Sequence, residues 1–162
     1  MPTIERSVEV HAPASIAYDV WTQFELFPHF MEGVEEVRQL DDRHLHWRAN
    51  VGGKVEEWDA EITEQIPDKR IAWRSQGGAG NAGVVTFHRL SDDTSRVMLQ
   101  LDYQPETLGE KVGDALGFMT RRVDGDLERF KEFVEERGRA VGGWRGAIPA
   151  KPDKGQRERR RT

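Results

Sequence analysis

Histidines are the first residues to examine for acid–base chemistry, because the imidazole titrates near neutral pH. His29 lies in the stretch FPHF, where a connection between a helix and a strand can hold it near the entrance of a binding site. It is our best single acid–base candidate, although a histidine in a loop is more often a solvent-exposed side chain. Arg74 and Asn81 are the other polar residues to test for a catalytic role.

A second pair of histidines raises the question of a metal site. His44 and His46 are two residues apart on a predicted strand, so they share one face and could both contact a metal ion. That face is opposite the one that carries Trp47, and no third ligand can be identified beside them. We therefore predict no metal site.

Other catalytic arrangements are disfavoured by position or by composition. Glu57, Asp59 and Glu61 alternate with Trp58, so we expect them to face water rather than to act as a catalytic pair. The glycine-rich stretch QGGAGNAG has no following lysine and opens no helix, so it is not a phosphate loop. The chain contains no cysteine, which excludes disulfides and thiolate chemistry. We expect no cofactor.

Charge is distributed unevenly along the 162 residues. Residues 145–162 carry seven basic and two acidic side chains, so this segment has a net charge of +5 and the remainder −10. An acidic body does not suit a nucleic-acid-binding protein. The basic segment has no apolar periodicity, and we predict a ligand-binding domain at 1–142 followed by a disordered, solvated tail at 143–162. The alternative role for this tail is contact with an anionic partner or a membrane surface.

The elements that must position the candidate residues follow from hydrophobic periodicity. TIERSVEVHA alternates like a half-buried strand. Pro13 then opens a first helical piece that extends to Phe24, and a second short helical piece follows around Pro28. Six strands joined by short turns follow from Val34 to Tyr103, which predicts an antiparallel meander. Apolar residues at spacings of three and four predict a long helix over 108–137, with a break or kink near Gly117. No segment approaches the roughly 20 apolar residues of a membrane span, and we expect a cytoplasmic protein.

A curved sheet around a single long helix leaves space between the two, and this space is the natural ligand site. Alternation places Trp58 and Ile62 on one face, with Trp73 on the neighbouring strand. Ten residues are expected to line the cavity: Phe27, Phe30, Trp58, Ile62, Trp73, Phe87, Leu101, Leu116, Met119 and Val123.

Several stretches resemble the START-like, or SRPBCC, superfamily. VEVHAPASIAYDVWTQFELFPHFMEGVEEV is similar to its opening, and EEWDAEITEQIPDKRIAWRS, NAGVVTFHRL and DLERFKEFVEER are similar to its polyketide cyclase/dehydrase branch. The resemblance covers about residues 3–137. It implies an α+β helix-grip fold, in which a curved seven-stranded antiparallel sheet wraps around a long C-terminal helix, with two short helices after the first strand.

The same resemblance exposes two departures from the cyclases. Those enzymes carry an inward arginine four residues after the tryptophan that corresponds to Trp58, and Ile62 stands there. They also carry a tyrosine where this chain has Gly33. An isoleucine side chain cannot donate a hydrogen bond to a carbonyl oxygen. Glycine has no side chain that could transfer a proton.

Three functions remain open from the sequence. The first is binding of a hydrophobic small molecule that is aromatic, polyketide-like or lipid-like. The second is a cyclase, aromatase or dehydrase with non-standard catalytic residues. The third is a protein-interaction module of the same superfamily, and the basic tail is the feature that suggests it. The sequence does not fix the oligomeric state.

Overall fold

The described part of the chain forms one antiparallel sheet with helices packed on one of its faces. The computed structural model describes residues 3–51, 53–76, 81–103, 112–137 and 148–149. The elements in chain order are β1 (Thr3–Val10), α1 (Ala14–Trp21), the 3-10 helix η1 (Phe24–His29), β2 (Val34–Gln39), β3 (His44–Val51), β4 (Lys54–Ile66), β5 (Arg70–Gln76), β6 (Asn81–Arg89), β7 (Ser95–Tyr103) and α2 (Val112–Arg137).

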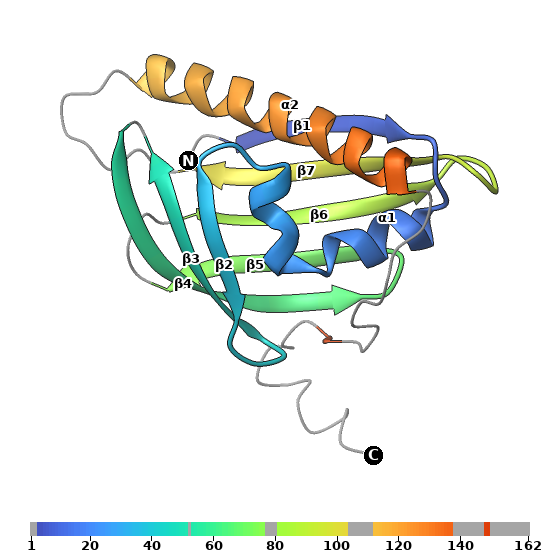
Figure 1. Cartoon of the computed structure of the whole chain (residues 1–162), viewed down its shortest axis with the longest axis horizontal. Coiled ribbons are helices and arrows are strands. Elements are labelled where there is room, and N and C mark those ends of the chain that lie inside the picture. The colour runs from blue at the N-terminus through green and yellow to red at the C-terminus, as the bar shows by residue number, and fades with distance from the viewer. Residues whose placement is uncertain (1–2, 52, 77–80, 104–111, 138–147, 150–162) are drawn as a thin grey trace, which may run out of the picture.

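The strands pair in the order β1-β7-β6-β5-β4-β3-β2, and every pair is antiparallel. The sheet curves, with α1, η1 and α2 on the face that we call inner; the opposite face is called outer (Figure 1). On the inner side α2 contacts β1, α1 contacts β6 and β7, and η1 contacts β2. The α+β class with seven strands, two short helices and a long C-terminal helix is therefore confirmed.

Two local features differ from the expectations. Phe24, expected in the first short helix, begins η1 instead, because the chain leaves the α conformation at Gln23. The long helix runs through Gly117 without the break that was expected there. The unfavourable helix propensity of glycine is only about 1 kcal/mol, which tertiary packing readily overrides.

The core fills the end of the inner face beneath α1 and η1. Trp21, Phe27, Phe30, Phe87 and Phe130 are all buried, and their rings meet mostly edge to face. Such packing leaves little room for a ligand. This part of the molecule is called the closed end.

The second half of α2 is tied to the sheet by polar contacts. Arg6 donates two hydrogen bonds to the carboxylate of Asp124, at 2.6 and 2.8 Å. Glu135 accepts a hydrogen bond of 2.7 Å from the backbone N–H of His11. These contacts fix the helix over β1 and over the connection that follows it.

One residue of the basic segment belongs to the core. Ile148, which lies within the tail predicted to be solvated, is buried and forms an isolated antiparallel bridge with Gln65. Two backbone hydrogen bonds of 2.7 Å join the two residues. This pairing is possible because β3 accompanies β4 only as far as Glu61, which leaves the last part of β4 with an open edge.

Candidate ligand-binding site

A series of aromatic rings runs along the inner face, from the closed end toward solvent. Trp21 contacts Phe27 with ring centroids 5.4 Å apart, and Phe27 contacts Trp47 at 5.5 Å. Trp47 in turn stacks on Trp58, with centroids 5.8 Å apart and planes only 6° from parallel. Trp21 and Phe27 are buried, whereas Trp47 and Trp58 remain partly exposed. The series therefore ends in an indole that a flat or apolar molecule can contact.

Strand register explains why the two tryptophans meet. Trp47 and Trp58 are directly opposite each other in the β3–β4 pair, and Trp47 is also opposite the buried Val37 of β2. Residues opposite each other in an antiparallel pair project to the same face. Both indoles therefore belong to the inner face, at the end of the sheet formed by β2, β3 and the first half of β4. This region is called the aromatic end.

The predicted lining residues divide into two groups. Ile62 is 1% exposed and belongs to the continuous core rather than to an open surface. The other buried members of the same core are Phe27, Phe30, Phe87, Leu101 and Val123. Trp73 and Met119 are partly buried against the core, and Trp58 is partly exposed. The side chain of Leu116 lies outside the described residues. Trp47 was not among the predicted lining residues. Its spacing of two residues from Leu45 and Ala49 nevertheless places it on the same, inner face of the strand.

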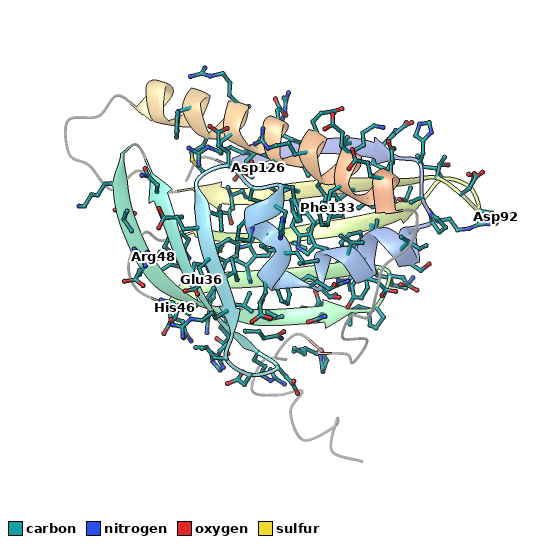
Figure 2. The ribbon with its side chains drawn as sticks, viewed as in Figure 1. Glu36, His46, Arg48, Asp92, Asp126 and Phe133 are labelled. Carbon is teal, nitrogen blue, oxygen red and sulfur yellow. The ribbon has the colours of Figure 1, made fainter. Side chains whose placement is uncertain are left out.

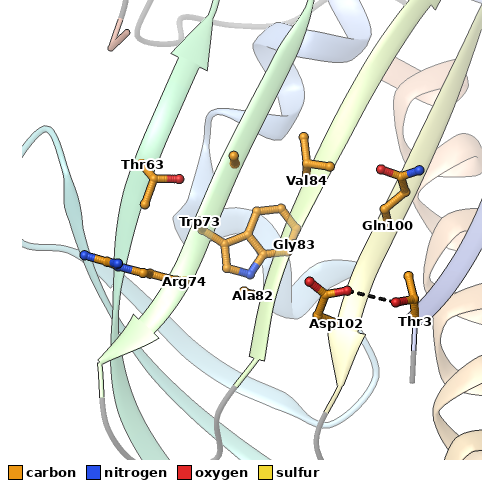
Figure 3. A pocket seen from close by; sticks show the side chains of 10 residues that line it. Thr3, Thr63, Trp73, Arg74, Ala82, Gly83, Val84, Gln100 and Asp102 are labelled. Atoms are coloured by element: carbon orange, nitrogen blue, oxygen red, sulfur yellow. Dashed lines mark hydrogen bonds between the residues drawn. The ribbon is translucent and has the colours of Figure 1, made fainter. Parts of the chain in front are cut away.

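Trp73 packs against the core on the inner face and also borders a depression in the sheet. It pairs with Ile62 and Gly83, and its indole lies 2.8 Å from the place where a Cβ on Gly83 would be. A depression of about 450 Å³ lies over β5, β6 and β7, and Trp73 and Gly83 both line it (Figure 3). Its other lining residues are Thr3, Thr63, Ala72, Arg74, Ala82, Val84, Gln100 and Asp102, and most of them alternate with buried residues and so belong to the outer face. The depression is thus not the predicted space between sheet and helix.

The three weak catalytic candidates do not come together. His29 is exposed on η1 and stacks on Phe133 of α2, with centroids 6.0 Å apart. Arg74 is exposed on the outer face, where it donates a hydrogen bond of 3.3 Å to Glu61. Asn81 begins β6 opposite Tyr103, and its side chain lies outside the described residues. The described geometry therefore contains no pairing of an acid with a base among them.

The position of the cyclase tyrosine is closed to any side chain. Gly33 has a φ of +83°, which favours glycine. A Cβ at this position would lie 2.6 Å from Nη1 of Arg122 and 2.7 Å from the carbonyl oxygen of Asn50. Glycine is therefore required by the backbone conformation and by the nearby carbonyl of Asn50, and the departure from the cyclase pattern is built into the packing.

A polar row on α2 was missed by the sequence reasoning. Asp126 accepts a hydrogen bond of 2.9 Å from the backbone N–H of Glu32, and Arg129 donates one of 2.9 Å to the carbonyl oxygen of Phe30. Burial raises the pKa of Asp126, although hydrogen bonds from Glu32 and Arg129 oppose this effect (Figure 2). The spacing of Arg122, Asp126 and Arg129 was a usable signal, because residues three and four apart share one flank of a helix.

His46 lies on the outer face, as its alternation with Trp47 predicts (Figure 2). Its Nδ1 is 2.7 Å from Asp59 and its Nε2 is 3.2 Å from Glu57. These hydrogen bonds raise the pKa of His46, and the one with Asp59 has a larger effect than the one with Glu57. Among the residues that the structure describes, no three His, Asp or Glu side chains are grouped so as to hold a metal ion.

The stability of the protein should depend on pH through His46. Because its pKa is raised by folding, its contribution is complete below the unfolded-state value of about 6.5 and is lost as the pH rises through the folded-state pKa. The loss should be below about 1 kcal/mol, since Asp59 and Glu57 are half exposed. Urea unfolding at a series of pH values should show this component in the wild type and not in His46→Gln. Replacement of the exposed His88 by Gln is the control; an unchanged pH dependence in His46→Gln would contradict the assignment.

None of the described helices is long and apolar enough to cross a membrane. Residues 10–132 match the family described as polyketide cyclase / dehydrase and lipid transport. A relative from Streptomyces lincolnensis, called an uncharacterized 17.2 kDa protein in the melC2-rnhH intergenic region, is 58% identical over 149 residues, which are 91% of this chain and 99% of that protein.

Solved structures show the same fold. A START superfamily protein from Mycobacterium smegmatis has a TM-score of 0.76 at 14% identity, over 83% of this chain and 98% of that one. The Zhui aromatase/cyclase from Streptomyces sp. R1128 has a TM-score of 0.73 at 19% identity, over 88% and 99% of the two chains. DR_A0006 from Deinococcus radiodurans is 28% identical, with a TM-score of 0.66, over 84% and 99%.

Proposed function

The chain belongs to the polyketide cyclase / dehydrase and lipid transport family, and from this membership we propose that it binds a hydrophobic small molecule. The ligand is aromatic, polyketide-like or lipid-like, and it contacts the aromatic end of the inner face, beside α2. The observation that carries this proposal is the Trp47–Trp58 stack, which continues the aromatic core and ends partly exposed.

Partial exposure of these indoles is informative because of where they lie. Tryptophan on an outer face needs no explanation, but an inner-face indole that is still exposed borders space that the protein does not fill. Apolar ligand sites are concave and lined by aromatic side chains, which supply large contact area and a flat stacking surface. The contrast with the buried rings of the closed end supports a ligand at the aromatic end.

A cyclase or dehydrase is the second candidate, favoured by the likeness in fold to an aromatase/cyclase. Against it stand the burial of Ile62, the absence of room for a side chain at Gly33 and the outward positions of His29 and Arg74. Incubation of the protein with a poly-β-ketone intermediate tests this candidate directly. A product distribution that equals that of the protein-free control rejects it.

Binding itself can be tested without knowledge of the ligand. Native mass spectrometry of freshly purified protein should reveal a bound apolar molecule, and thermal-shift measurements across a panel of aromatic compounds and lipids should raise the Tm. A protein that is always empty and whose Tm is unchanged by the whole panel contradicts the proposal.

Replacing Trp58 by alanine should weaken binding of N-phenyl-1-naphthylamine, a neutral fluorescent apolar probe, by at least about tenfold. The expected loss reflects removal of a stacking surface, and buried aromatic anchors typically contribute at this level or above. Titration of the probe fluorescence measures the affinity. The control is Leu90→Ala, which removes an exposed apolar side chain at the β6–β7 turn; equal affinities of the two variants would place the probe elsewhere.

A further inference from the structure

Arg122 of α2 stands at the rim of the aromatic end. Its Nη1 donates a hydrogen bond of 2.7 Å to the carbonyl oxygen of Glu32, and its guanidinium carbon lies 5.0 Å from the ring centroid of Phe118. The next residue, Val123, is buried against the core, and Met119, one turn earlier, packs on it. The side chain therefore projects from the flank of the helix, next to the apolar stripe that faces the sheet.

The backbone opposite Arg122 is shaped around the guanidinium. Nη1 occupies space that a Cβ on Gly33 would need, and the positive φ of Gly33 is held by a hydrogen bond of 2.7 Å from the N–H of Asn50 to the Gly33 carbonyl. Gly33 precedes Val34, which pairs with Ala49, two residues from Trp47. The register thus brings the guanidinium to the same end of the inner face as the tryptophan stack.

Arg122 forms no ion pair with a described carboxylate, although Asp126, one turn along α2, is close enough for the guanidinium charge to oppose the rise that burial causes in its pKa. Other cations along this side of the molecule have carboxylate partners: Arg6 with Asp124, Arg129 with Asp126 and Glu32, and Lys131 with Glu135. Arg122 is partly buried, yet within the described ranges no carboxylate lies at ion-pair distance from it. Asp126 is engaged by the Glu32 N–H and by Arg129. A guanidinium that is partly removed from water, and whose other N–H donors have no partner among the residues that the structure describes, is a ready site for an anionic oxygen.

We propose that Arg122 binds an anionic group of the ligand, so that the protein selects apolar molecules that carry a carboxylate or another acidic oxygen group. This inference rests on the proposed function: the tryptophan stack contacts the apolar body, and Arg122 contacts the charged end. Guanidinium groups suit this task because their N–H donors form a planar fork that matches such anions.

Two fluorescent probes with one apolar body separate this role from a merely structural one. 1-Anilinonaphthalene-8-sulfonate carries an anionic group, and N-phenyl-1-naphthylamine is its neutral counterpart. The wild type should bind the sulfonate at least about tenfold more tightly than the neutral probe, because a charge-assisted contact is added. In Arg122→Gln this preference should disappear, while the neutral probe keeps its affinity. The glutamine amide can still donate to the Glu32 carbonyl, so the link between α2 and the loop can persist.

The control is Arg121→Gln, which removes the same charge from the neighbouring, exposed position of the helix. It should leave the preference intact, whereas Arg122→Lys should keep part of it. A preference that survives in Arg122→Gln, or that is lost equally in Arg121→Gln, overturns the assignment to Arg122. Equal binding of both probes by the wild type overturns the inference and leaves the proposed function standing. Binding of neither probe overturns both.

Discussion

Replacing Ile62 by arginine should destabilise the protein by about 3–5 kcal/mol rather than create a cyclase, because a buried charge would lack any partner. Ile62 is 1% exposed, and it pairs with Trp73 in the sheet. Its backbone N–H donates to the carbonyl oxygen of Arg43 at 2.6 Å, so the strand cannot easily shift to release the new side chain. Urea unfolding followed by tryptophan fluorescence measures the loss of unfolding free energy.

The matched control for this substitution is Ile62→Val, which removes one methylene group and should cost only about 0.5–1.5 kcal/mol. A large difference between the two variants attributes the effect to the buried charge and not to disturbed packing. If Ile62→Arg were as stable as the wild type, the guanidinium would have found solvent or an anion. Position 62 would then border an open space, as it is expected to do in the cyclases.

The faces of the strands could be predicted because alternation is a local property of the sequence. Trp58 and Ile62 do project inward, and Glu57, Asp59 and His46 do lie on the outer face. What alternation cannot give is the depth of burial, which depends on the elements that cover each part of the sheet. Ile62 and Trp58 share one face of one strand, yet the first is core and the second is partly exposed. That difference separates Trp58, which we propose contacts the ligand, from Ile62, which packs in the core.

Hydrophobic periodicity could not predict the polar rim of the candidate site, formed by Gly33 and Arg122, for a different reason. The effect of Gly33 depends on a residue of α2, Arg122, which is distant in the sequence. A glycine before a strand predicts only a turn, and an arginine beside an apolar helical stripe predicts only a solvated flank. Their juxtaposition comes from the way α2 crosses the start of β2. The same limit applies to Ile148, whose pairing with Gln65 requires knowledge of where β3 ends.

Removing the ring of Phe130 should destabilise the protein by about 3–5 kcal/mol, since truncation of a buried phenylalanine leaves a cavity in a tightly packed core. Phe130 is fully buried, and its ring centroid lies 5.0 Å from that of Trp21 and 5.2 Å from that of Phe30. It therefore joins α2 to the aromatic cluster of the closed end, as does Phe133, whose ring centroid lies 5.3 Å from that of Phe30. Chemical denaturation of Phe130→Ala measures the effect, with Phe118→Ala as the control on the same helix. Phe118 is 38% exposed and its ring contacts the guanidinium of Arg122, so its loss should cost about 1 kcal/mol or less.

Comparison of Phe130→Ala with Trp58→Ala tests the division of the inner face into a closed end and an aromatic end. Well below its Tm, Phe130→Ala should bind N-phenyl-1-naphthylamine within about twofold of the wild type, because its cavity lies in packed core away from Trp58. Trp58→Ala should show the opposite pattern, with weak binding and a smaller loss of stability, since Trp58 is already partly exposed. If Phe130→Ala weakened binding as strongly as Trp58→Ala, the ligand would reach into the closed end. The aromatic cluster there would then be part of the site, and burial could not be used to tell its residues from packing residues.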